Sequence, residues 1–242
     1  MNSSPDCVIG INPLQELLNH SPERISKVLV LKTDNLGDRK QNLLVDIQRQ
    51  GIPIDFAKKD TLASYAGTDS HQGFVAILKK RVYTDLVTFL NKAPERTLIL
   101  AIDSVYDPHN FGAILRSAEC FGVGAILWSK NRGTDITPVV SKTSSGASEI
   151  LPLIKISNLA SSLKQCKDKG FTLIAADMCE GAINLEEFTY PDRSVLILGS
   201  EGEGIQPLVQ SMCDITVFIP MKGKITSLNV SQASAVLLSR WH

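Results

Sequence analysis

The chain has 242 residues, with 25 basic and 25 acidic side chains and a formal net charge of zero at pH 7. Hydrophobic residues make up 43% and charged residues 21%, which is ordinary for a protein with a core of its own. The balanced charge excludes a uniformly basic nucleic-acid binder, although it leaves room for a local basic patch.

The N-terminal sequence and the cysteines give no sign of export or of membrane insertion. Residues 1–18 lack a basic stretch followed by a long apolar run, and no apolar stretch approaches the ~20 residues of a membrane-spanning helix. The five cysteines form no C-x-x-C pair, and their odd, scattered set is a poor disulfide framework. We therefore expect a reduced, cytoplasmic protein with no metal site and no membrane contact.

The first 80 residues predict a small α/β domain. Apolar residues at helical spacing predict helices over 12–19 and 39–50. Short apolar runs predict strands over 27–31, 52–57 and 73–78.

Residues 81–96 predict a linker with one short helix, because the stretch is charged and contains Pro94 near its end. After it, strands alternate with helices, which indicates a parallel sheet with helices on both faces. The expected strands are 97–103, 124–128, 151–156, 171–177, 194–199 and 215–220. Ligands of such sheets bind beyond the C-terminal ends of the strands, so we expect functional groups just after Asp103, Gly199 and Pro220.

The stretch DPHNFGAILRSAECFG (107–122) begins like a loop and continues like an amphipathic helix. Asp107 and Pro108 suit the N-cap and the first helical position. Gly112 lowers helix stability relative to Ala, which indicates that something approaches its backbone closely. Arg116 carries a fork of donors that suits a phosphate, although this stretch alone slightly favours a surface arginine on an ordinary helix.

The stretch LILGSEGEGI (196–205) places three glycines and two glutamates directly after an apolar strand. Glycine-rich loops after strands often hold phosphates through backbone N–H groups. This spacing matches neither G-x-G-x-x-G nor a P-loop, and two carboxylates would repel a pyrophosphate. The loop therefore favours a neutral or cationic ligand held by main-chain groups. A simple tight turn is the alternative, and it leaves Glu201 unexplained.

The stretch IPMKGKITSLNVSQASAVLLSRW (219–241) ends in a predicted helix rich in small residues. Ser227 and Asn229 are typical helix-start residues, so N-capping explains each of them when it is considered singly. The small side chains from Ala233 to Ala235 permit close packing, either within the chain or against a second subunit.

Taken together and in this order, the three stretches resemble the signature motifs of the SpoU (TrmH-type) family of SPOUT RNA ribose 2′-O-methyltransferases. The N-terminal part, with GINPLQELL and HQGFVAIL, resembles the L30e-like RNA-binding domain of the branch that modifies large-subunit ribosomal RNA. The resemblance implies a substrate-binding domain over 1–80, a linker over 81–96 and a SPOUT methyltransferase domain over 97–242.

The resemblance also implies the chemistry. The cofactor would be S-adenosylmethionine, and the methyl acceptor would be the ribose 2′-hydroxyl of a guanosine in the peptidyl-transferase region of 23S ribosomal RNA. A homodimer is implied, with the small-residue face of the last helix as a candidate interface. The family fold has a deep trefoil knot, whereas the alternation of strands and helices alone predicts an unknotted, Rossmann-like sheet.

The site residues follow from their positions in the motifs. The residues expected to contact the cofactor are Leu198, Gly199, Ile219, Met221 and Leu228. The residues expected at the catalytic centre are Asn110, Arg116, Glu201, Ser227 and Asn229. The residues expected to contact RNA in the N-terminal domain are Lys58, Lys59, His71 and Gln72. Because a guanidinium is a poor base at neutral pH, Arg116 is expected to act as an electrostatic clamp, while Asn110 orients the ribose.

Three other functions are compatible with parts of the sequence. A tRNA ribose 2′-O-methyltransferase of the same family fits the motifs but not the additional N-terminal domain. A non-catalytic RNA-binding ribosome assembly factor fits the fold, but the intact motif residues oppose it. A dinucleotide-dependent oxidoreductase fits the α/β alternation but not the glycine spacing. The chain also departs from the family pattern at Ser239, where many relatives carry Glu, and in its short ending LLSRWH.

Overall fold

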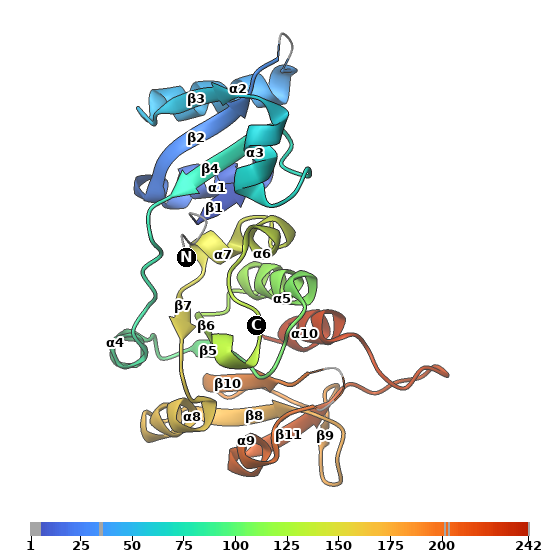
Figure 1. Ribbon diagram of the computed structural model, residues 1–242. Helices are drawn as coiled ribbons and strands as arrows, with labels where there is room; N and C mark the ends of the chain where they lie inside the picture. Colours follow the sequence, from blue (N-terminus) through green and yellow to red (C-terminus); the bar gives the residue numbers. More distant parts are fainter. Residues whose placement is uncertain (1–5, 34–35, 201, 203, 242) are drawn as a thin grey trace. The chain divides into compact units, whose positions relative to one another are not determined.

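The computed structural model describes residues 6–33, 36–200, 202 and 204–241. The chain forms two compact units, coloured along the sequence in Figure 1. The N-terminal unit contains the described residues up to Val82 together with Ile136–Ile150, and the C-terminal unit contains the remainder. The segment Ile136–Ile150, which the sequence analysis assigned to the C-terminal domain, therefore packs with the N-terminal unit.

The N-terminal unit is built on a four-stranded sheet in the order β1–β4–β2–β3. Its strands are β1 (Cys7–Ile9), β2 (Ile25–Leu31), β3 (Ile54–Ala57) and β4 (Phe74–Leu78). β4 pairs antiparallel with β1 and β2, whereas β2 and β3 are parallel. The three strands expected in this part of the chain are confirmed. β1 was not expected, because a strand of three residues offers too little pattern.

Helices cover both faces of this sheet. They are α1 (Ile11–His20), η1 (Pro22–Arg24), α2 (Asp38–Arg49), α3 (Lys59–Ala66), α6 (Pro138–Thr143) and α7 (Ala147–Ile150). α1 and α2 pack on one face and α3 on the other, while α6 contacts β1 and α7 contacts α1. The two expected helices are confirmed. α3 was missed because it buries only Leu62 and Ala66, which is too weak a periodicity.

The C-terminal unit is built on a seven-stranded sheet in the order β7–β6–β5–β10–β8–β11–β9. Its strands are β5 (Thr97–Ile102), β6 (Ala125–Trp128), β7 (Leu153–Lys155), β8 (Thr172–Ala176), β9 (Ile183–Asn184), β10 (Arg193–Leu198) and β11 (Ile215–Phe218). All the pairings are parallel, as expected. Every residue of β5 is buried, which is why this strand reads as a continuous apolar run.

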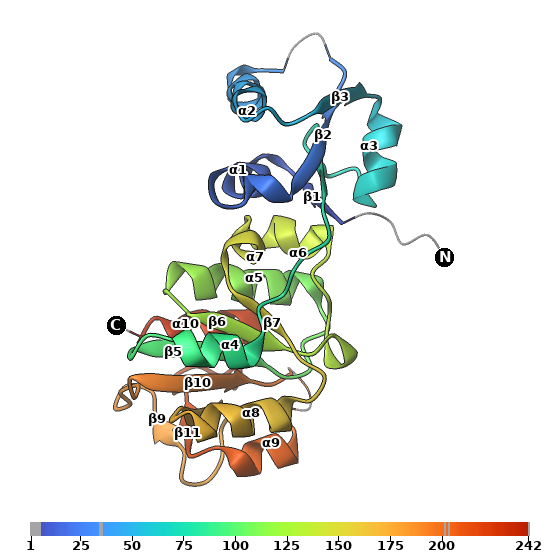
Figure 2. The ribbon, with the colours of Figure 1, turned by 90° about the vertical axis from the view of Figure 1, so that its left-hand side faces the viewer.

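Helices cover both faces of the large sheet (Figure 2). α4 (Leu86–Lys92), α8 (Leu159–Asp168) and α9 (Pro207–Met212) contribute to one shared core on the first face. α5 (Pro108–Cys120) lies on the other face, where Phe111 contacts Trp128 with ring centroids 5.9 Å apart. α10 (Val230–Leu238) packs beside α5, and the short helix η2 (Lys130–Arg132) follows β6. Within the described ranges, the helices are too short or too polar to span a membrane.

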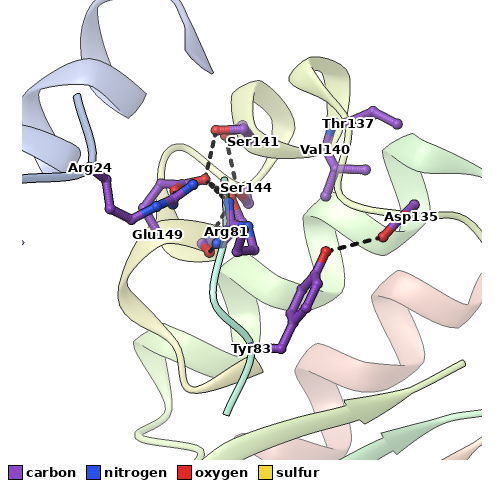
Figure 3. Close-up of polar contacts among 10 residues, drawn as sticks. Arg24, Arg81, Tyr83, Asp135, Thr137, Val140, Ser141, Ser144 and Glu149 are labelled. Carbon is purple, nitrogen blue, oxygen red and sulfur yellow. Dashed lines mark hydrogen bonds and ion pairs between the residues drawn. The ribbon is translucent and has the colours of Figure 1, made fainter. Parts of the chain in front are cut away.

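One buried carboxylate fastens the segment Ile136–Ile150 to the N-terminal unit (Figure 3). The side chain of Glu149 has no solvent exposure and pairs with Arg24 and with Arg81, whose Nη2 lies 2.5 Å from Oε1. Ser148 donates its hydroxyl to the same carboxylate at 2.9 Å. The segment is thus an integral part of the N-terminal unit, although the chain enters it from β6 and leaves it toward β7.

Candidate functional site

The C-terminal unit contains a cavity of about 440 Å³ beyond the C-terminal ends of β8, β10 and β11. This is the edge at which parallel sheets bind their ligands. The volume lies within the ~300–1,000 Å³ that is usual for small-molecule sites. Across the described residues, no group of three or more His, Cys, Asp or Glu side chains is arranged to hold a metal ion.

The sequence analysis located most of this cavity. All five residues expected to contact the cofactor line it: Leu198, Gly199, Ile219, Met221 and Leu228. Ser227, expected at the catalytic centre, also lines it. Asp177 and Met178 after β8, and Ala233 on α10, also line the cavity and were not predicted to do so. A signal for Asp177 was available, since it is the last residue of the predicted strand 171–177, which ends at the same edge of the sheet.

Gly199 sits where two backbone segments meet. A Cβ atom there would lie 2.2 Å from the carbonyl carbon of Gly204 and 2.4 Å from the nitrogen of Ile205. Ser200 and Gly204, which both line the cavity, exchange two backbone hydrogen bonds at 3.0 and 3.1 Å. Glu201, which was predicted at the catalytic centre, lies outside the described residues.

The far end of this loop is anchored by Asp103, which follows β5. Its carboxylate is buried and accepts hydrogen bonds from the backbone N–H of Gln206 at 3.0 Å and from Gln206 Nε2 at 2.6 Å. The backbone N–H of Asp103 donates to the carbonyl of Leu198 at 2.8 Å. Asp103 therefore ties β5, β10 and the end of the loop together, which is a positioning role.

Asn110 and Asn229 come together from distant parts of the sequence. The Nδ2 of Asn229 donates to the Oδ1 of Asn110 at 3.1 Å. Asn229 is also the N-cap of α10, since its Oδ1 accepts the backbone N–H of Ser231 at 2.8 Å. Because Leu228 and Val230 on either side of Asn229 line the cavity, this asparagine pair lies at its edge.

The first turn of α5 forms as expected. Asp107 is the N-cap and accepts the backbone N–H of His109 at 2.9 Å, and Pro108 is the first helical residue. Gly112 is buried within the chain. Its small size is compatible with close packing inside the chain, and the close approach of a nucleotide to its backbone stays a prediction.

Arg116 is not brought to the cavity within one chain. It lies on the exposed side of α5 and is not among the described residues that line the cavity. Six residues separate it from Asn110, so at 3.6 residues per turn the two side chains leave the helix in different directions. Its guanidinium has no ion-pair partner in the described part of the chain.

The residues expected to contact RNA divide into two pairs. Lys58 and Lys59 are exposed at the start of α3. His71 is only 2% exposed, and the Oε1 of Gln72 accepts the backbone N–H of Ile11 at 3.0 Å, which fixes the start of α1. His71 and Gln72 therefore have structural contacts that the sequence did not reveal.

Two family profiles match the chain. The profile described as SpoU rRNA Methylase family matches residues 97–239, and the profile described as RNA 2′-O ribose methyltransferase substrate binding matches residues 7–84.

Several relatives and solved structures match over nearly the whole length of the chain. A Pasteurella multocida protein named 23S rRNA (guanosine-2′-O-)-methyltransferase RlmB is 36% identical over 96% of this chain and 95% of its own. A Photobacterium profundum protein of the same name is 36% identical over 97% and 96%. The SpoU methyltransferase AviRb from Streptomyces viridochromogenes, solved in complex with AdoMet, aligns with a TM-score of 0.80 at 21% identity, over 98% of this chain and 89% of that one.

Proposed function

The chain belongs to the SpoU rRNA methylase family, and on this premise we propose that it methylates the ribose 2′-hydroxyl of a guanosine in 23S ribosomal RNA, with S-adenosylmethionine as the methyl donor. We place the guanosine in the peptidyl-transferase region and the enzyme in the cytoplasm. The observation that carries the proposal is the cavity at the ends of β8, β10 and β11, which is lined by the five residues that the motifs assign to the cofactor.

The described lining of the cavity fits this cofactor. Leu198, Ile219 and Leu228 provide apolar surface for an adenine ring, and the turn at Gly199 leaves no side chain between the ligand and the main chain. Asp177 is the charged side chain in the described lining, and a carboxylate suits a ligand that carries a sulfonium cation. No lysine or arginine belongs to the described lining, which argues against a dinucleotide and its pyrophosphate.

The cofactor, when bound, supplies a methyl group on a positively charged sulfur. In the transfer, the ribose oxygen would form a bond to the methyl carbon, the electrons of the broken carbon–sulfur bond would stay on sulfur, and the hydroxyl proton would pass to an acceptor. Arg116 is too weak a base for that step, so we assign it to the target phosphate or to the developing alkoxide. Asn110 orients the ribose, and Ser227 and Asn229 lie beside it. The proton is accepted by Glu201, by a phosphate oxygen or by water.

We further propose that the site is completed across a homodimer. Arg116 is exposed and lies apart from the cavity lining of its own chain, so a second subunit would have to bring an arginine to each cavity. The proposal is tested by mixing two inactive variants, Arg116→Ala and Gly199→Ala. Mixed dimers would contain one intact site and regain part of the activity. Absence of any recovery, with exchange of subunits verified, would contradict a shared site.

The proposed function is tested by transfer of labelled methyl groups from S-adenosylmethionine to protein-free 23S rRNA and, in parallel, to bulk tRNA. We expect label in the rRNA only. Label in tRNA alone would keep the chemistry but change the substrate, and cofactor binding without any transfer would favour an assembly factor. Arg116→Ala should reduce turnover at saturating RNA; a loss of RNA affinity alone would overturn its assignment.

The tRNA alternative has less support. The solved structure of the A. aeolicus TrmH/SpoU tRNA modifying enzyme aligns with 64% of this chain at a TM-score of 0.54. The relatives named for 23S rRNA cover 96% or more of it. The relatives that span the N-terminal unit as well are those named for 23S rRNA, which favours ribosomal RNA as the substrate.

We also propose the deep trefoil knot implied by the resemblance. Its support is connectivity: α10 packs beside α5, and the segment that leads into α10 lines the cavity together with the loop after β10. Stretching single molecules by both termini tests it. A knotted chain extends less than the ~3.3–3.6 Å per residue of a free chain, whereas full extension would exclude a knot.

A further inference from the structure

Three lysines from separate elements surround one buried histidine of the N-terminal unit. His71 lies in the loop before β4, and Lys40 on α2, Lys59 on α3 and Lys142 on α6 are all near enough to act on its charge. Burial lowers the pKa of His71, and the three ammonium groups lower it further, while Asp69 acts in the opposite direction. Three lysine ammonium groups and one carboxylate, that of Asp69, therefore lie near this loop, which leaves a net positive charge there.

The lysines lie close to the loop that holds the histidine. Lys142 donates its Nζ to the carbonyl of Ser70 at 2.7 Å. A Cβ atom on Gly73 would lie 3.8 Å from the Nζ of Lys40. Lys59 lies 3.8 Å from Asp69, and both side chains are well exposed. The lysines therefore approach the same six residues, 68–73, which we name the histidine loop.

His71 contributes a hydrogen-bond donor that lacks an acceptor. Its Nδ1 accepts the backbone N–H of Gly73 at 3.1 Å, so the proton of the neutral ring sits on Nε2. Nε2 is buried and has no hydrogen-bond partner in the described part of the chain. A buried donor without a partner lowers stability, and the positive charges of the three lysines near this loop exceed the single negative charge of Asp69. An anion with several acceptor oxygens, bound by the ammonium groups at this loop, would balance their charge.

We propose that Lys40, Lys59 and Lys142 form a binding site for an RNA backbone phosphate at the histidine loop, with His71 beneath it. The inference rests on the proposed function and deepens it by naming residues that hold the substrate. Phosphodiester groups carry one negative charge per nucleotide, and lysines are common partners for them. The site binds the RNA backbone and contacts no base. It therefore increases the affinity for RNA but does not select the nucleotide that is methylated.

Lys142 connects the proposed phosphate site to the C-terminal unit along the chain. It belongs to Ile136–Ile150, the segment that leaves β6 and returns to β7 of the catalytic sheet, and Glu149 fastens this segment to the N-terminal unit. The phosphate site therefore includes a residue whose chain continues directly into the catalytic unit. Local sequence could not reveal this, because Lys142 lies far along the chain from the other two lysines.

The test compares Lys40→Gln and Lys142→Gln with wild type in binding a transcript of the peptidyl-transferase region, across about 50 to 300 mM salt. We expect each variant to bind roughly 3–10-fold more weakly, and the slope of log K against log salt to fall by ~0.7–0.9 per lost contact. Lys142→Arg should restore both. Lys164→Gln, which removes an equal charge from the exposed side of α8, should change neither. Thermal unfolding verifies that each variant is folded.

Wild-type affinity and slope in Lys40→Gln and Lys142→Gln would overturn the site. A second arm adds ~10 mM inorganic phosphate at constant ionic strength. If free phosphate raises the unfolding temperature of wild type but not of Lys142→Gln, while RNA binding is the same in both, the site serves a free anion and the RNA assignment fails. RNA binding is measured without the methyl donor, so failure of the proposed function appears separately, as absence of methyl transfer by wild type.

Discussion

Gly199 occupies a position where a single methyl group would force the backbone to move. Its Cβ would overlap the main chain of Gly204 and Ile205, so we expect Gly199→Ala to lower the free energy of unfolding by ~2 kcal/mol. Because the displaced turn borders the cavity, affinity for S-adenosylmethionine should fall at least ~10-fold. Denaturant unfolding and titration calorimetry measure the two effects.

Gly202 provides the matched control in the same loop. A Cβ there meets nothing within 4 Å, so Gly202→Ala should change the unfolding free energy of the unliganded protein by no more than ~0.5 kcal/mol. Equal destabilisation by the two substitutions would show that the loop is sensitive to any side chain, and the steric account of Gly199 would be wrong.

His71 predicts a pH dependence of stability. Its pKa in the folded protein is lowered, chiefly by burial, so below the ordinary value of ~6.5 the unfolded chain binds the proton more readily. The stabilising contribution is complete above that value and is lost as pH falls through it. The free energy of unfolding is measured for wild type and for His71→Gln between about pH 7.5 and 5.5. As pH falls over this range, it should decrease more steeply for wild type than for the variant. Parallel curves would contradict the assignment, since the two proteins differ only at this residue.

The residues that the sequence could locate are those whose type is itself unusual. Gly199 and Asn229 stood out within motifs, and the structure gives both a definite contact. Asp177 and Lys142 did not stand out, because an acid after a strand and a lysine on a short helix are ordinary until the fold brings their neighbours together. Arg116 was found by its motif, yet a single chain leaves it apart from the cavity.

At the scale of elements, Glu149 holds the segment Ile136–Ile150 in place. Glu149→Ala would leave Arg24 and Arg81 without their carboxylate, and loss of one partner from a buried ion pair typically costs ~3–5 kcal/mol. Urea unfolding should register a loss of that order. Glu186→Ala removes an exposed partner of Lys222, whose Nζ lies 3.5 Å away, and should cost less than ~1 kcal/mol. If the two variants lost similar amounts of unfolding free energy, burial would not explain the contribution of Glu149 to stability.

Element prediction succeeded where burial imposes a strong pattern. The strands of the large sheet read as apolar runs because both faces are covered, and the parallel pairing followed from the helices between them. β1, β9 and α3 were missed because they are short or bury few side chains. The packing of Ile136–Ile150 depends on Glu149 meeting two arginines from other parts of the chain, which no local pattern records.

At the scale of the whole molecule, the two units predict the behaviour of a chain shortened to residues 83–242. The cavity lining lies within the C-terminal unit, so binding of S-adenosylmethionine should stay within ~3-fold of wild type. Val140 and Ala147 would lose the unit that buries them, so the shortened chain should bind a hydrophobic dye and lose RNA affinity. A dye-free, fully stable fragment would instead support a domain boundary near residue 80 with the segment on the C-terminal side.

The most direct test of the central claim is to locate the methyl group. Protein-free 23S rRNA is incubated with the protein and S-adenosylmethionine, digested with nucleases, and analysed by mass spectrometry for methylated nucleosides and their positions. The account predicts one 2′-O-methylguanosine, in the peptidyl-transferase region, whose yield falls with Gly199→Ala when S-adenosylmethionine is limiting. A methyl group on a base, on a ribose of another region, or on no nucleotide of 23S rRNA would contradict it.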